Sequence, residues 1–164
     1  MAIDIASDEI WQDVAEYIWA QVGVSLALKS CEQGNYLNLP TRDDLSAILP
    51  LVLVEAQDAE GRSLPGHSGQ ECAHQVHIHY VVKLSDTDIS DRKTRQGRDA
   101  IANLFTQTPF DGGTALPGVT LPARCNVFRK SLVGLRILET FTEMELAIGH
   151  GVVDLEVVLH HYNT

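Results

Sequence analysis

The stretch Val152-Val153-Asp154-Leu155-Glu156-Val157-Val158-Leu159 decides the fold class of this chain. Every second residue in it is apolar and belongs to one set: Val153, Leu155, Val157 and Leu159. The intervening set is more polar: Asp154, Glu156, Val158 and His160. Successive side chains of a strand point to opposite faces, so this period of two predicts a strand with one face in a core. The other face is expected to meet water or a partner.

Two further segments predict a long antiparallel hairpin. Leu51 begins an apolar run that we expect to continue as a strand to about Gln57, and Ala73 to Leu84 alternates like the C-terminal stretch. In this second segment one face carries His74, Val76, Ile78, Tyr80 and Val82, and the other carries Gln75, His77, His79, Val81 and Lys83. Between the two strands, Asp58 to Gln70 holds three glycines and a proline, which predicts an extended loop.

Two amphipathic helices are predicted. The first runs from about Asp8 to Val22, with Ser7 as its N-cap. Its Trp11 and Trp19 widen the apolar face and are predicted to be core residues, the alternative being anchors for a partner. The second helix runs from about Asp91 to Phe105 after a capping Ser90. It has an apolar stripe and a basic face of Arg92, Lys93, Arg95 and Arg98, interpreted as solvated or as a docking surface.

The remaining segments are less regular. Lys29–Asn38 is polar and turn-rich, a short helical turn is expected over 42–48 after Thr41, and Thr108–Pro122 reads as a loop. Three segments are then expected to lead into the last strand: Arg124–Phe128, Leu132–Thr142 and Glu143–Ile148. Gly149-His150-Gly151 is interpreted as a tight turn before that strand.

This order of elements predicts an α+β fold, a mostly antiparallel sheet with a long hairpin packed against two main helices. The length of 164 residues suits one domain spanning residues 1–164. Hydrophobic residues make up 45% of the chain and charged residues 21%, values that argue against disorder of the whole chain.

The net charge of −10 argues against a general nucleic-acid-binding surface, which needs clustered Lys and Arg. Three separated cysteines without a CxxC pair exclude a zinc ribbon and predict reduced thiols. We expect no signal peptide and no membrane partner, because the N-terminus lacks a basic region and no window is apolar enough to span a bilayer.

His77 and His79 are the candidate metal ligands. Residues at i and i+2 share one face of a strand, and zinc or iron accepts histidine nitrogens. His74 lies on the opposite face, so a third ligand would have to come from Asp154, Glu156 or His160 on a neighbouring strand. Polar residues are also ordinary on the wet face of a strand, which is the simpler interpretation.

Nothing in the sequence predicts catalysis or a cofactor. No GxSxG, GxGxxG or GxxxxGK[ST] pattern is present. Cys72 and His74 share a strand face, and Asp154 and Glu156 form a same-face carboxylate pair, but solvated strands carry such pairs routinely. The expectation is therefore a protein that is not an enzyme.

Taken together, the N-terminal helix, the Leu51–Leu84 hairpin, the helix after Ser90 and the terminal Glu143–His161 segment resemble tail terminator proteins of tailed bacteriophages. The resemblance lies in the order of elements over most of the chain. It implies a structural virion protein, assembled in the host cytoplasm, that forms a homo-oligomeric ring, commonly sixfold. Such a ring caps the tail tube and joins the tail to the head-side connector, while DNA passes through the lumen without specific binding.

Subunit contacts are expected at the Ser63–Gln70 loop, on the basic helix face and at the edge of the sheet. The residues proposed for these contacts are Ser63, Leu64, His67, Gln70, Arg92, Arg95 and Arg98. Three alternatives stay open: another neck or baseplate component of the virion, a metal-dependent enzyme using His77 and His79, and a soluble adaptor or binding module from a non-viral genome.

Overall fold

Five strands form a single sheet in the order β1-β2-β3-β5-β4. The computed structural model describes residues 7–35, 45–63, 69–84, 92–106, 116–119, 121, 125–143 and 146–162. The strands are β1 (Ser30–Gln33), β2 (Leu51–Ser63), β3 (Gly69–Lys83), β4 (Cys125–Glu143) and β5 (Leu146–Tyr162). The helices are α1 (Ser7–Val22), α2 (Leu45–Ile48) and α3 (Arg92–Ala102).

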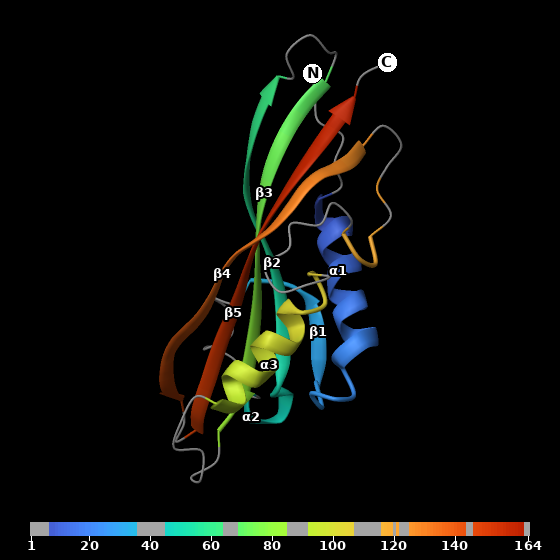
Figure 1. The fold of residues 1–164 in the computed structure, drawn as a ribbon. Helices are drawn as coiled ribbons and strands as arrows, with labels where there is room; N and C mark the ends of the chain where they lie inside the picture. Colours follow the sequence, from blue (N-terminus) through green and yellow to red (C-terminus); the bar gives the residue numbers. More distant parts are fainter. Residues whose placement is uncertain are drawn as a thin grey trace.

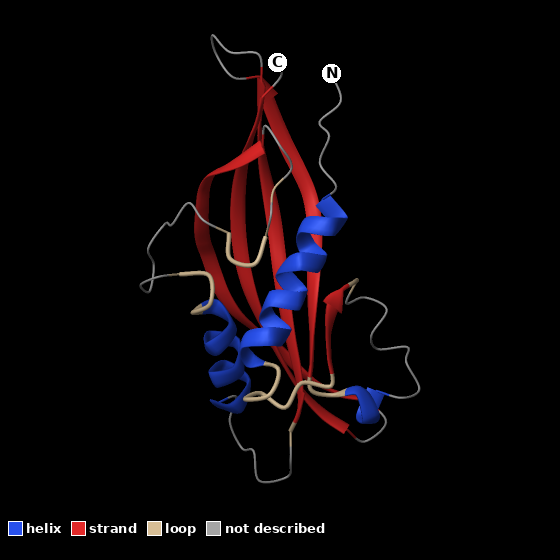
Figure 2. Cartoon of the chain, turned by 90° about the vertical axis from the view of Figure 1, so that its right-hand side faces the viewer, coloured by secondary structure: helices blue, strands red, loops and turns tan. Residues whose placement is uncertain are grey.

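The architecture is α+β, as the sequence predicts. Helices α1 and α3 lie side by side on one face of the twisted sheet (Figures 1 and 2). All the paired strands are antiparallel except β1, which runs parallel to β2. The main core lies between these helices and the sheet, and its largest fully buried side chains include Trp11, Ile18, Ile78, Ile101, Phe105 and Leu155.

The predicted alternation is confirmed in both long strands. In β5, Val153, Leu155 and Val157 point into the main core, and β3 contributes Val76 and Ile78 to the same core. The two strands pair directly, with Val76 opposite Leu155 and Ile78 opposite Val153. The opposite face is the one that carries His77, His79 and Asp154, and we call it the polar face. Its lower end packs Leu51, Leu53, Val81 and Ile148 against Ile48 of α2.

The loop predicted over Asp58–Gln70 is largely wrong. Strand β2 continues to Ser63 and β3 begins at Gly69, with Ser63 paired to Gln70. This part of the hairpin extends beyond α1 and α3 (Figure 1). A sheet segment without a helix layer needs no apolar stripe, so backbone pairing forms a strand there that hydrophobic periodicity does not reveal.

The turn predicted at Gly149-His150-Gly151 is also wrong, since all three residues lie inside β5. The two glycines face α3: a methyl group at position 149 would clash with Thr94, and one at position 151 would contact Arg98. A close approach of helix to strand therefore explains these glycines. Gly97 of α3 serves the same packing, because a side chain there would clash with the ring of Tyr80.

The segments around the last hairpin also differ from expectation. The first two segments expected before the last strand form one 19-residue strand, β4, interrupted by register shifts near Val127, Leu132 and Leu138. The third, Glu143–Ile148, is not a separate strand, because β4 ends at Glu143 and β5 begins at Leu146. The polar segment predicted as turns at Lys29–Asn38 contains β1, which is four residues long. Because pairing in β4 is irregular and β1 is short, neither segment shows a clear period of two in its sequence.

The helix predictions hold closely. Helix α1 begins at Ser7, α2 matches the short helical turn, and α3 lies within the predicted 91–105 range. Trp11 is 1% exposed and belongs to the core, whereas Trp19 is 46% exposed and does not. The capping residues Thr41 and Ser90 and most of the Thr108–Pro122 loop lie outside the described residues.

Candidate metal centre on the polar face

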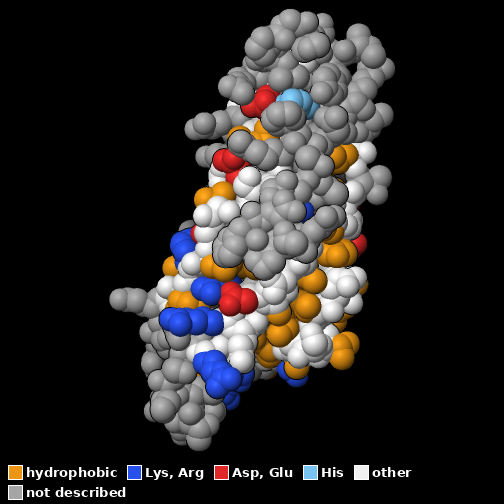
Figure 3. Space-filling model, in the orientation of Figure 1, with side chains coloured by type: hydrophobic (Ala, Val, Ile, Leu, Met, Phe, Trp, Pro, Cys, Tyr) orange, Lys and Arg blue, Asp and Glu red, His pale blue; other side chains and the backbone are white. Residues whose placement is uncertain are grey.

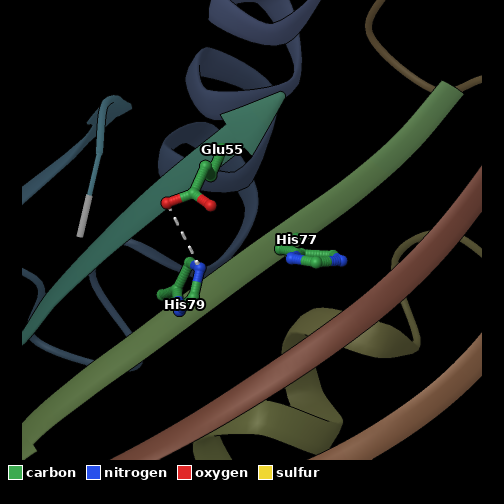
Figure 4. A group of neighbouring side chains, drawn as sticks. All are labelled: Glu55, His77 and His79. Atoms are coloured by element: carbon green, nitrogen blue, oxygen red, sulfur yellow. Dashed lines mark ion pairs between the residues drawn. The ribbon is translucent and has the colours of Figure 1, made fainter. Parts of the chain in front are cut away.

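The predicted histidine pair lies on the polar face, and β2 adds a carboxylate to it. His77 and His79 project from β3, and Glu55 of β2 is the direct cross-strand partner of His77. One possible ligand atom from each of the three side chains lies within 4.8 Å of the others. Figure 4 shows Glu55 and His79 pointing toward each other, with the ring of His77 beside them.

This cluster is largely shielded from solvent. Oε2 of Glu55 lies 3.8 Å from Nε2 of His79, and their side chains are 18% and 4% exposed. The His77 side chain is 29% exposed, so it forms the open side of the cluster. Two imidazoles and a carboxylate form a ligand set that suits zinc and other divalent transition metals.

His79 also contacts a histidine outside this cluster, His150 of β5. Nδ1 of His79 is 2.8 Å from Nε2 of His150 on β5, and both residues are buried. Burial, reinforced by the positive charges possible at His150, His77 and Arg136, lowers the pKa of His79 to about 3. Burial and the charge of Arg136 lower the pKa of His150 to about 4. Both imidazoles are therefore neutral at neutral pH, the form in which histidine binds metals.

Asp154 lies next to His77, but its carboxylate is paired with Arg136. Its carboxylate accepts two hydrogen bonds from Arg136 of β4, of 2.5 Å from Nε and 2.8 Å from Nη2. Its Oδ1 also lies 3.5 Å from Nε2 of His77. The sequence proposed Asp154 as a third ligand, and the structure places it as a neighbour of His77 that is already paired to an arginine.

The other proposed third ligands lie farther along the polar face. Glu156 accepts a hydrogen bond of 3.0 Å from Gln75, and His160 lies 2.9 Å from Glu71. His74 lies on the helix-covered face, with its ring edge-on to Trp11 at 5.8 Å. The structure therefore brings Glu55 to the histidine pair, and not Glu156 or His160.

Sequence reasoning missed Glu55 because it looked for a partner only on the C-terminal strand. The sequence could have indicated Glu55, because it is the one charged residue in the 51–57 strand and falls on the face opposite to Val52 and Val54. Pairing β2 with β3 as a hairpin then places it across from the HxH pair.

The two described free thiols are Cys72, which is buried, and Cys31, which is half-buried. Burial raises the pKa of Cys31 to about 12, and its Sγ donates a hydrogen bond of 3.1 Å to the carbonyl of Ala15. Burial also raises the pKa of Cys72, which is 2% exposed. A thiol that stays protonated is a poor nucleophile, so neither residue supports covalent catalysis.

The predicted contact residues are dispersed. Ser63 and Gln70 pair near the tip of the β2–β3 hairpin, while Leu64 and His67 lie outside the described residues. On α3, Arg92, Lys93 and Arg95 are exposed and form the basic area seen over that helix in Figure 3. Arg98 differs, because it is paired with Asp99 at 2.8 Å and its side chain is 11% exposed.

Comparisons with known proteins leave the family open: no protein-family model matches this chain, and no curated protein matches it either. Among the described residues, none of the helices has the length and apolar character needed to cross a membrane.

Proposed function

We propose that this protein is a structural subunit of a tailed-phage neck, which acts by assembling with its own copies into a ring. On the resemblance given above, the ring is a sixfold tail terminator that caps the tail tube and contacts the head-side connector. The protein has no catalytic role in this proposal, and DNA passes through the ring without specific binding. The long edge strand β4 is the observation that carries the proposal.

Strand β4 lies at the end of the sheet order and pairs only with β5 among the described strands. It has 19 residues, whereas strands in globular proteins usually have about 3–10. No described strand pairs with the outer side of β4, and a sheet edge of this length is one to which another chain can add a strand. Its bulges divide the edge into short segments, so a partner must match their spacing.

The bulge at Leu132/Gly134 places an apolar side chain on this edge. Val133 lies within the register shift and is 61% exposed. A single exposed valine is ordinary, but one on an open edge strand is where association between subunits would bury apolar area.

The opposite edge of the sheet is formed by other strands, β1 and the outer part of β2. Contact between two unlike edges favours a ring over a closed dimer. At this opposite edge, β1 pairs with β2 only as far as Val54, so the outer edge of β2 continues beyond it toward Ser63. Joining two different edges is a head-to-tail contact, and such contacts close into rings when the rotation divides the circle. The basic face of α3 on a chain of net charge −10 adds a surface suited to an acidic neighbour.

A pair of variants tests this proposal by light scattering across protein concentration. Val133→Lys puts a charge on the β4 edge, whereas Val24→Lys changes a valine that is 96% exposed in the turn after α1. We expect the wild-type chain and the Val24 variant to form an oligomer of the same mass, and the Val133 variant to remain a monomer. An oligomer that survives Val133→Lys, or a wild-type chain that stays monomeric at every concentration, would contradict the proposal.

A further inference from the structure

We propose that Glu55, His77 and His79 bind one divalent transition metal ion, with Zn²⁺ as the best match. This site is independent of the proposed ring, because a single chain supplies all three ligands.

The distances suit a shared metal better than a direct ion pair. Zinc binds imidazole nitrogen and carboxylate oxygen at about 2.0–2.2 Å, so two ligand atoms of a tetrahedral site lie roughly 3.3–3.5 Å apart. The distance between Oε2 of Glu55 and Nε2 of His79 is 3.8 Å, beyond a hydrogen bond but a few tenths of an ångström from that value. Small side-chain rotations would bring both atoms to one ion.

The backbone fixes the positions of all three ligands. His77 and His79 are two residues apart on β3, and Glu55 is the register partner of His77 on β2. Ligands held on paired strands lose little conformational freedom when a metal binds. The register shift of β2 begins immediately after this point, between Ala56 and Ala59. A metal at Glu55 would therefore hold the hairpin together beside its irregular segment.

Each histidine also has the outer partner that metal-binding histidines usually have. A ligating imidazole typically donates its other N–H to a carboxylate, a carbonyl or another acceptor, which fixes its tautomer. Nδ1 of His79 has Nε2 of His150 at 2.8 Å, and Nε2 of His77 has Asp154 at 3.5 Å. Arg136 in turn orients Asp154 through two hydrogen bonds. When Nδ1 of His79 donates to His150 and Nε2 of His77 faces Asp154, Nε2 of His79 and Nδ1 of His77 are the atoms left to bind a metal.

The three protein ligands leave one position of a tetrahedral zinc site for water. His77 is the most exposed of the three side chains, so that position lies on the open side of the cluster. A metal bound at this site is expected to stabilise the β2–β3 hairpin.

Isothermal titration calorimetry of the full chain, freed of metal by chelation, tests the site with ZnCl₂. We expect one Zn²⁺ per chain, a Zn²⁺-dependent rise in the midpoint of thermal unfolding, and visible absorption bands when Co²⁺ replaces Zn²⁺. His77→Ala and Glu55→Gln each remove a ligand. Asp154→Asn removes an outer partner and should weaken binding about 10–100-fold, with a larger loss for the two ligand variants.

His160→Gln is the matched control, because it removes an imidazole from the same face at a site where His160 contacts Glu71. It should bind Zn²⁺ as the wild-type chain does. Far-ultraviolet circular dichroism identifies any variant that fails to fold, and the partly exposed His77 makes its alanine variant the safer of the ligand tests. The proposal is wrong if the wild-type chain binds no Zn²⁺ or Co²⁺. It is equally wrong if one-to-one binding survives both His77→Ala and Glu55→Gln, or if His160→Gln alone abolishes it.

Discussion

Nδ1 of His79 and Nε2 of His150 lie 2.8 Å apart, and this contact joins β3 to β5 inside the polar face. One ring nitrogen must donate and the other accept, so the two rings cannot both carry an extra proton. Burial goes further and keeps both rings neutral at neutral pH, because it lowers the pKa of His79 to about 3 and that of His150 to about 4.

The first prediction is a loss of stability in mild acid. In the unfolded chain both histidines titrate near 6.5, so between that pH and the folded values the unfolded state binds more protons. Stability should be unaffected by the pair above about pH 7 and should fall as the pH drops below 6.5. Between pH 7 and pH 5 the loss should be on the order of 1–2 kcal/mol for each imidazole.

Urea unfolding at a series of pH values measures this effect. A His150→Gln variant should show a shallower dependence on pH between 6.5 and 4.5 than the wild-type chain, because one of the two proton acceptors is gone. At pH 8 its pH dependence should match that of the wild type, which serves as the internal control. Identical slopes for the two proteins in the acid range would contradict the assignment.

A second prediction concerns the close packing of α3 on the sheet. Gly97→Ala should destabilise the chain by about 1–3 kcal/mol, because the added methyl group clashes with the ring of Tyr80. Gly134→Ala is the control, since a methyl group there meets only Oδ2 of Asp154 at an ordinary 3.6 Å. Thermal unfolding of both variants checks the prediction, and equal losses would mean that the helix does not lie this close to β3.

A third prediction separates the two tryptophans. Trp11→Ala should cost about 3–5 kcal/mol, because the side chain is 1% exposed in the main core. Trp19→Ala should cost far less, since Trp19 is 46% exposed. Chemical denaturation gives both values, and a reversed order would contradict the placement of α1 on the sheet.

A fourth prediction gives the size of the change in subunit affinity when Val133 on the β4 edge is replaced. If Val133 is buried between subunits, Val133→Lys should raise the dissociation constant of the assembly at least roughly thirtyfold, which corresponds to about 2 kcal/mol for an interface anchor. Analytical ultracentrifugation over a range of concentrations measures this change. A shift of less than about threefold would exclude Val133 as an anchor.

Much of the fold could be predicted because two strands carry a clear period of two. The alternation at Val153, Leu155 and Val157 placed one face in the core, and the apolar stripe predicted over 91–105 placed Ile101 of α3 and Phe105, which follows α3, there as well. The errors arose where packing does not follow that period. Gly149 allows α3 to pack closely on the sheet, but in the sequence a glycine of this kind looks like a turn residue. The part of β2 around Gly61 has no helix packed on it, so its sequence looks like that of a loop.

The candidate site was only partly predictable for a similar reason. The HxH spacing placed His77 and His79 on one face, but their third neighbour depends on which strand pairs with β3 on each side. Glu55 and Asp154 both lie opposite His77, one on β2 and the other on β5. Only the side-chain contacts show that Asp154 is held by Arg136 while Glu55 turns toward His79.

Negative-stain electron microscopy of the purified chain tests the central claim most directly. We expect rings of uniform diameter with a central opening from the wild-type protein, rings of the same size from Val24→Lys, and none from Val133→Lys. Fields that contain only single small particles of the wild-type protein at high concentration, or rings that persist in Val133→Lys, would contradict assembly through the β4 edge.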